Sequence, residues 1–221
     1  MLVRHAETGH NADSRVQGQA DIPLSELGAR QAAALGAHLR REPLAAVVAS
    51  PLVRARATAE AIAAPHGLAV ATEPDLMEMH VGEMEGLSTA EMRARFPDFL
   101  AEWVTERGPS LRMPGGESLD DVQARAWAVV ERLRERFTGE TVALVSHNFV
   151  LSCLITRALE MPLHEFRRFR LSVCGVSTLR FRDDRVVLAQ LNDTCHLARA
   201  GLPSTDPWPA RAPGGARQLP S

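Results

Sequence analysis

The sequence contains no lysine and no tyrosine, so its 25 basic residues are all arginines. A lysine Schiff base and a tyrosine proton donor are therefore excluded from its chemistry, and arginine does not exchange protons near neutral pH. An excess of positive charge is also lacking, because 27 acidic residues bring the net charge to −2. Without such an excess, we do not expect nucleic acid as a partner.

Cysteines and long apolar runs are scarce as well. The three cysteines, Cys153, Cys174 and Cys195, lie far apart without a CxxC spacing, which favours buried free thiols over a disulfide framework or a zinc site. No stretch approaches the roughly 20 apolar residues that cross a membrane, and the N-terminus lacks the apolar run of a signal peptide. We therefore expect a cytoplasmic protein with no membrane partner.

The composition is that of a globular chain, with 45% hydrophobic and 24% charged residues among 221, enough for one large domain. Short continuous apolar runs predict strands that are covered on both faces. These strands are expected at 1–3, 44–49 and 141–145, followed by an antiparallel pair at 174–181 and 185–191. Helices are expected at about 25–41, 50–64, 118–137, 148–159 and 162–169, with a short one after Ser88.

Strands that alternate with helices predict an α/β fold. We expect a three-layer α/β/α sandwich with a mostly parallel central sheet and an antiparallel edge. The domain is predicted to span 1–197, and the Pro/Ala/Gly-rich residues 198–221 to form a tail. Residues 92–116 interrupt the pattern and are interpreted as a lid excursion. Its aromatic residues, Phe96, Phe99 and Trp103, either cover a substrate or form a small core of their own.

Polar residues follow three of the predicted strands. They are Arg4 and His5 after the first strand, Ser50 and Arg54 after the second, and Ser146, His147 and Asn148 after the third. Ser50 is also a candidate N-cap of the helix that follows, with Pro51 at its first position. Ligands in open α/β sheets bind beyond the carboxyl ends of the strands. Arginine forks and helix N-termini at one such edge predict a phosphate site.

These residues lie in an ordered series of motifs that resembles the histidine phosphatase superfamily, in its phosphoglycerate mutase-like branch. The motifs are LVRHAET (2–8) with Asn11, RVQGQAD (15–21), PLSELG (23–28), SPLVRA (50–55) with Thr58 and Ala59, LME (76–78) with Gly82 and EGL (85–87), PGGES (114–118), VSH (145–147) and NDTCHL (192–197). The resemblance covers about residues 2–197, and the order of the motifs makes it specific.

The resemblance implies that His5 attacks phosphorus and forms a covalent phosphohistidine. Three cationic or polar groups are then expected around the phosphoryl group, namely Arg4, Arg54 and His147. Glu78 is expected to protonate the leaving oxygen and then to take a proton from water. Further candidates for substrate binding are Asn11, Gln17, Gly18 and Asn148. No metal and no cofactor are expected, because the cationic side chains take over their role.

Several assignments stay open at this point. Glu73, Glu83 and Glu85 are acids close to Glu78, and Asn148 stands where the family usually has glycine. The segment from Glu78 to Gly86 is shorter than in typical phosphoglycerate mutases, which also use extra basic residues, whereas this chain has no lysine. Both features favour a metal-independent phosphatase that acts on a small phosphorylated metabolite. In this respect the chain resembles bacterial broad-specificity and alpha-ribazole phosphatases. The alternatives are a cofactor-dependent phosphoglycerate mutase and a non-catalytic phosphate-binding or interaction module on the same fold. A homodimer is kept as one option for the assembly of the chain.

Overall fold

In the computed structural model, which describes residues 1–182 and 185–204, one mixed sheet forms the centre of the molecule. Its strands are β1 (Leu2–Arg4), β2 (Leu44–Ala49), β3 (Val70–Thr72), β4 (Thr141–Ser146), β5 (Val176–Arg182) and β6 (Arg185–Asp193). Their order is β3-β2-β4-β1-β5-β6. The first four are parallel to one another, whereas β5 and β6 form an antiparallel edge. The predicted sheet is therefore confirmed.

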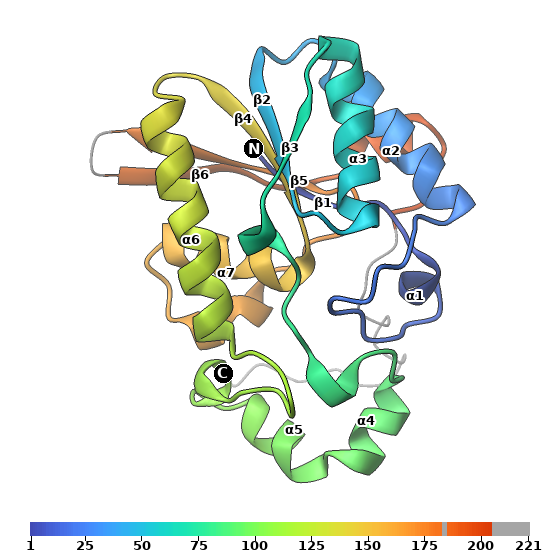
Figure 1. The fold of residues 1–221 in the computed structure, drawn as a ribbon, viewed down its shortest axis with the longest axis vertical. Helices are drawn as coiled ribbons and strands as arrows, with labels where there is room; N and C mark the ends of the chain where they lie inside the picture. The colour runs from blue at the N-terminus through green and yellow to red at the C-terminus, as the bar shows by residue number, and fades with distance from the viewer. Residues whose placement is uncertain (183–184, 205–221) are drawn as a thin grey trace, which may run out of the picture.

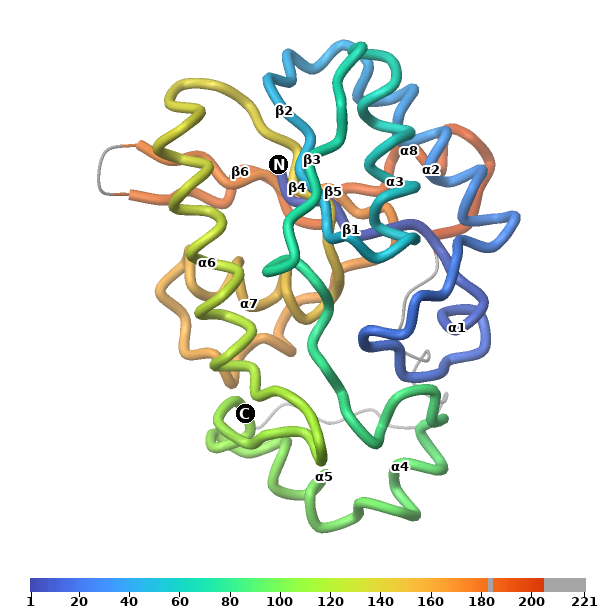
Figure 2. Tube along the Cα trace, in the orientation of Figure 1, coloured from blue at the N-terminus to red at the C-terminus, as the bar shows by residue number. Residues whose placement is uncertain are grey.

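Helices cover both faces of this sheet, which gives the predicted three layers (Figures 1 and 2). One face carries α2 (Glu26–Leu39), α3 (Val53–Ala63) and α8 (Cys195–Arg199), and the other carries α6 (Leu119–Arg136) and α7 (Asn148–Ala158). Neighbouring strand residues enter opposite cores, as a period of two requires. Leu2, Val48 and Leu144 pack toward α6 and α7, whereas Val3, Val47, Ala49, Ala143 and Val145 pack toward α2 and α3.

Side-chain caps define where three of the helices begin. Ser25, Ser88 and Ser118 each accept a hydrogen bond from a backbone N–H in the first turn, at the starts of α2, α4 (Thr89–Arg95) and α6. The shorter elements are α1 (Gly9–Ala12), α5 (Pro97–Trp103) and 3₁₀ turns at Ala64–His66, Pro74–Leu76, Gly82–Met84, Gly108–Ser110 and Leu163–Arg168. Figure 1 places α1, α4 and α5 at one end of the molecule, away from the sheet.

Three predictions about local structure were wrong. The helix expected from Ser50 begins at Val53, and its N-cap is Leu52. The segment expected as a helix at 162–169 is a 3₁₀ helix. The parallel strand β3 was not predicted, because its three residues are only half-buried or exposed and form no apolar run. The prediction that all three cysteines are buried was wrong for one of them. Cys153 and Cys174 are buried, whereas Cys195 is exposed.

The excursion packs onto the main body. Trp103 is buried, its ring stacks on Phe99 at 5.7 Å between centroids, and it meets Phe149 and Phe166 edge-on. Since Phe149 lies on α7, the aromatic residues of α5 join the core on that face of the sheet. The aromatics therefore do not form a separate small core of their own, and their predicted role as a cover over the substrate remains a prediction.

The packed part of the chain extends a little beyond the expected boundary at 197. Leu202 is buried, and the Pro203 carbonyl accepts a hydrogen bond from Gln31 on α2. The remainder of the predicted tail, 205–221, lies outside the described residues, as do 183–184. No helix within the described part of the chain combines the length and apolar character needed to cross a membrane.

Candidate functional site

The carboxyl ends of β1, β2 and β4 bring the predicted residues together. The His5 amide donates to the Ser146 carbonyl (3.0 Å), and the Ser50 amide donates to the Val145 carbonyl (3.0 Å), so the three strand ends are hydrogen-bonded side by side. The rings of His5 and His147 lie 5.1 Å apart between centroids. All five predicted catalytic side chains are buried, namely Arg4, His5, Arg54, Glu78 and His147.

The hydrogen bond of His5 determines which ring nitrogen can react. Nδ1 lies 2.7 Å from the Ala6 carbonyl, which can only accept, so Nδ1 carries the proton and Nε2 keeps its lone pair. Burial holds the pKa of His5 well below its usual value, and the charges of Arg54 and Arg4 lower that pKa further. His5 is therefore a neutral imidazole with a free Nε2 at neutral pH.

Arg54 is fully buried at the start of α3 and is oriented by two backbone carbonyls. Its Nη2 donates to Gly18 (2.7 Å) and its Nη1 donates to Ala20 (2.8 Å). The loop that carries these carbonyls is held in turn by Glu85, whose carboxylate accepts from the amides of Gly18 and Gln19 (2.9 Å each). Glu85 therefore positions Arg54 through the loop.

Gly18 is required by packing. A Cβ at this position would lie 2.6 Å from Val81 Cγ2 and 2.9 Å from the Met79 carbonyl, closer than side chains approach one another. The structure therefore places Gly18 beside the site through its carbonyl on Arg54, and its predicted contact with substrate remains a prediction.

Arg4 is anchored by the segment that precedes β5. Its Nη1 donates to the Leu171 carbonyl (2.6 Å), and its amide donates to the Gly175 carbonyl (3.2 Å). Asn192 on β6 holds this segment, because its Oδ1 accepts from the Ser172 amide (2.7 Å) and its Nδ2 donates to the Ser172 hydroxyl (3.2 Å). The orientation of Arg4 thus depends on a residue near the end of the domain.

Ser50 supports His147 and does not cap a helix. Its hydroxyl lies 2.8 Å from Nε2 of His147 and accepts from the Leu52 amide (3.3 Å). Nδ1 of His147 is buried and has no hydrogen-bond partner within the described chain. Burial and the neighbouring Arg54 lower the pKa of His147 well below its usual value. Contact of His147 with a phosphoryl group remains a prediction.

Glu78 differs from its acidic neighbours in its surroundings. It is buried, whereas Glu83 is exposed, Glu73 pairs with Arg132 (2.8 Å), and Glu85 is occupied by backbone amides. Its Oε1 accepts from the Met79 amide (2.9 Å) and its Oε2 from the Phe149 amide (3.3 Å).

Burial raises the pKa of Glu78 above its usual value, although the two amides, Arg54 and Arg4 oppose the shift. The same burial that keeps His5 neutral thus favours the protonated form of Glu78. A neutral imidazole and a buried carboxyl group of raised pKa are the two kinds of group that nucleophilic displacement with acid assistance requires.

The remaining predicted residues lie at the margin of this group. Asn11 and Gln17 both contact Thr8, since the Thr8 hydroxyl lies 3.0 Å from Asn11 Oδ1 and 2.9 Å from Gln17 Oε1. Gln17 Nε2 is buried without a hydrogen-bond partner among residues 1–182 and 185–204. Asn148 is half-buried and begins α7, one residue before Phe149. Contact of Asn11, Gln17 and Asn148 with phosphate remains a prediction.

A shallow, open depression of about 380 Å³ lies against the segment that carries Glu78. It is lined by Gln19, His80, Gly115, Gly116 and Glu117. Gln19 Nε2 donates to the Glu78 backbone carbonyl (3.0 Å), so the depression adjoins the backbone of this segment. A larger cavity of about 900 Å³ opens at the opposite ends of the strands, where Met1, Leu2 and Val142 line it. The catalytic group does not border the larger cavity.

One cluster of potential metal ligands occurs among the described residues, and it lies outside the candidate site. His38, Asp193 and Cys195 have their ligand atoms within 4.8 Å of one another. The carboxylate of Asp193 already accepts from the Cys195 amide (2.8 Å) and from Gln190 (2.7 Å). These contacts explain the arrangement as a local turn at the start of α8.

Comparison with known proteins gives a consistent result. The histidine phosphatase superfamily (branch 1) matches residues 1–194. A relative from Photorhabdus laumondii, "Probable phosphoglycerate mutase GpmB", is 36% identical over 82% of this chain and 84% of its own length.

Two solved structures are similar along most of the chain. A mycobacterial glucosyl-3-phosphoglycerate phosphatase has a TM-score of 0.81 at 30% identity and covers 87% of this chain and 98% of its own. An Escherichia coli protein described as a putative alpha-ribazole-5'-P phosphatase has a TM-score of 0.79 at 29% identity. The match covers 87% of this chain and 94% of the Escherichia coli chain. Sequence, fold and the order of the motifs agree that this chain belongs to the histidine phosphatase superfamily, branch 1, whose members are phosphatases or mutases.

Proposed function

We propose that this protein is a metal-independent phosphatase that hydrolyses a small polar phosphomonoester through a phosphohistidine at His5. The observation that carries the proposal is the pairing of His5, a buried neutral imidazole with a free Nε2, with Glu78, a buried carboxyl of raised pKa. Arg4 and Arg54, held by backbone carbonyls, supply the positive charge that a phosphoryl group needs.

In the first step, the lone pair of His5 Nε2 attacks phosphorus in line with the leaving oxygen. The bond from phosphorus to that oxygen breaks, and the oxygen takes its electron pair together with a proton from Glu78. Arg4, Arg54 and His147 stabilise charge on the equatorial oxygens, where most of the catalytic effect in phosphoryl transfer arises. An alcohol is released, and the phosphoryl group stays on His5.

In the second step, Glu78 acts as a base because it is now a carboxylate. It takes a proton from water as the water oxygen attacks phosphorus, and the bond from phosphorus to Nε2 breaks with return of the electron pair to the ring. Inorganic phosphate leaves, while His5 and Glu78 regain their starting protonation states. The balance is one phosphomonoester and one water converted into one alcohol and one phosphate.

We infer the class of leaving group from the open depression next to the segment that carries Glu78. Its side chains, from Gln19, His80 and Glu117, are polar, and two glycines complete its wall. Such a lining accommodates a hydroxylated or charged leaving group better than an acyl chain or an aromatic ring. The preferred substrate is therefore expected to be a small polar metabolite phosphate.

A phosphoglycerate mutase is the second candidate, because the relative from Photorhabdus is named as a probable one. A mutase shares the first step but returns the phosphoryl group to a second hydroxyl instead of to water. A non-catalytic module is less well supported, since phosphate binding requires neither the free Nε2 of His5 nor a buried acid beside it.

We expect the full chain to release phosphate from nitrophenyl phosphate in excess chelator, at the rate measured without chelator. A metal-dependent alkaline phosphatase in the same assay controls for effective chelation. Sugar phosphates are expected to be hydrolysed more efficiently than long-chain alkyl phosphates. Isomerisation of phosphoglycerate that depends on added bisphosphoglycerate, without net phosphate release, would establish the mutase. Neither release nor transfer would leave only a binding function.

A further inference from the structure

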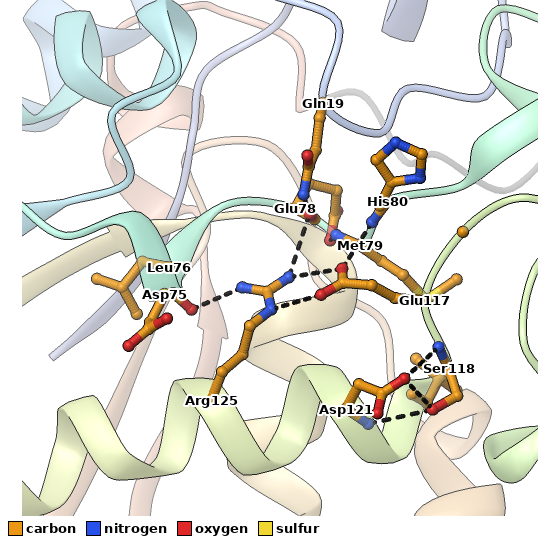
Figure 3. Close-up of polar contacts among 12 residues, drawn as sticks. Gln19, Asp75, Leu76, Glu78, Met79, His80, Glu117, Ser118, Asp121 and Arg125 are labelled. Atoms are coloured by element: carbon orange, nitrogen blue, oxygen red, sulfur yellow. Dashed lines mark hydrogen bonds and ion pairs between the residues drawn. The ribbon is translucent and has the colours of Figure 1, made fainter.

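Arg125 of α6 holds the segment that carries Glu78 through the backbone carbonyls of that segment (Figure 3). Its Nη1 donates to the Asp75 carbonyl (2.6 Å), and its Nη2 donates to the Glu78 carbonyl (3.2 Å). The same guanidinium forms a bidentate pair with Glu117, with Nε and Nη2 each 3.0 Å from a carboxylate oxygen. One side chain thus joins both ends of the acid segment to the 114–118 loop.

Glu117 completes the attachment. Its Oε2 accepts from the His80 amide (2.8 Å), and its own amide donates to the His80 carbonyl (2.8 Å). The loop packs so closely that a Cβ on Gly116 would lie 2.1 Å from the His80 carbonyl. Residues 77–81 lie between two 3₁₀ turns and outside any regular helix or strand, so these contacts replace the backbone pairing that secondary structure would provide.

The pair is partly shielded from water, which makes it stronger than a surface ion pair. The side chains of Arg125 and Glu117 are 17% and 23% exposed, whereas Arg132, two turns later on the same helix, is 53% exposed in its pair with Glu73. Bidentate geometry and partial burial both favour a lasting contact over a fluctuating one. Arg125 also has no carboxylate partner besides Glu117 among the described residues.

We propose that Arg125 and Glu117 are positioning residues, which together fix the place and the protonation of Glu78. This inference rests on the proposed role of Glu78 as the acid. Arg125 contributes geometry through the Asp75 and Glu78 carbonyls, and Glu117 neutralises its charge. Without that neutralisation, a guanidinium 3.2 Å from the Glu78 carbonyl would favour the ionised carboxylate.

The two partners have opposite electrostatic effects on Glu78, because each neutral substitution leaves the other charge unpaired. These effects add to those of Arg54 and Arg4, whose charges also act on Glu78 and stay the same in both variants. In Glu117→Gln the unpaired Arg125 cation lowers the pKa of Glu78, so the alkaline limb of kcat/KM moves to lower pH. In Arg125→Gln the unpaired Glu117 carboxylate raises the pKa of Glu78, and the limb moves to higher pH. Arg125→Lys keeps the positive charge but loses the bidentate guanidinium geometry. The alkaline limb of kcat/KM is therefore expected at its wild-type position, while the rate of phosphoenzyme formation is only partly restored.

The second readout is the rate of phosphoenzyme formation in a single turnover. In Arg125→Gln it is expected to fall about tenfold or more for an alkyl phosphate, which needs the proton, and less than threefold for nitrophenyl phosphate. Arg132→Gln is the matched control, because it removes the same residue type from the same helix beside Glu73. It should change neither readout, and thermal unfolding should show every variant folded.

The possible outcomes separate this inference from the proposed function. A wild-type chain that forms no phosphoenzyme would overturn both. Phosphoenzyme formation that Arg125→Gln slows equally for both leaving groups, or pH limbs that do not move in opposite directions, would overturn the positioning role and leave the phosphatase intact. If Arg125→Gln does not fold, Glu117→Gln and Arg125→Lys decide. An alkaline limb that stays in place in Glu117→Gln, or that moves in Arg125→Lys, would overturn the positioning role.

Discussion

Replacing His5 by alanine is expected to lower phosphate release by about three orders of magnitude or more, because the chain loses its nucleophile and retains only binding groups. No other side chain can take its place. His147 is buried in contact with Ser50 through Nε2, and its Nδ1 is buried with no hydrogen-bond partner to activate it within the described part of the chain.

The intermediate provides the measurement. Rapid quenching with labelled substrate, without acid, should trap one phosphate per chain in a bond that is stable to base and labile to acid. Peptide mapping should place the label on His5. Label on His147 or on a serine would contradict the assignment of the nucleophile, as would an alanine variant that still forms the adduct.

Loss of the fold must be separated from loss of chemistry, because His5 is buried and bonded to the Ala6 carbonyl. His5→Asn retains a side-chain donor toward that carbonyl and lacks a nucleophilic nitrogen, so it should unfold close to the wild-type temperature while remaining inactive. His10→Ala is the matched control, since His10 is a half-buried histidine on α1. It is expected to keep most of the activity.

The convergence of the site was predictable because parallel strands place their carboxyl ends at one edge. Arg4 pairs in register with Ser146, and this pairing alone brings the first histidine next to the second. The apolar runs of β2 and β4 and the capping serines were equally visible in the sequence. What could be inferred was the identity and proximity of the groups, since both follow from local pattern and sheet topology.

The supporting residues could not be inferred in the same way, because their partners lie far away along the chain. Ser50 follows a strand and precedes proline, a context that also fits a helix cap, and only the tertiary structure assigns it to His147. Glu85 reaches the Gly18 amide, and Asn192 reaches Ser172. For Arg125, the sequence offered one signal of a buried role. Arg125 is a charged residue that directly precedes Ala126, which belongs to the apolar stripe of α6.

Glu78→Gln provides the strongest separate test, because it removes a proton while keeping nearly the same shape. An alkyl alkoxide cannot leave without that proton, whereas nitrophenolate leaves largely without help. Phosphoenzyme formation in a single turnover is therefore expected to slow by about 10²- to 10⁴-fold for an alkyl phosphate. For nitrophenyl phosphate it should slow by less than about tenfold. Glu83→Gln, at an exposed acid five residues later, should alter neither rate.

The pH profile of the wild-type enzyme distinguishes the acid from the nucleophile in the same experiment. Activity should fall at low pH as His5 is protonated, at a pH well below the usual histidine value because burial and the two arginines lower its pKa. It should also fall at high pH as Glu78 ionises, above the usual carboxyl value because burial raises its pKa. With an alkyl phosphate, Glu78→Gln should abolish the alkaline limb and leave the acid limb in place. Equal losses for both leaving groups, or an alkaline limb that survives the substitution, would remove Glu78 from the acid role.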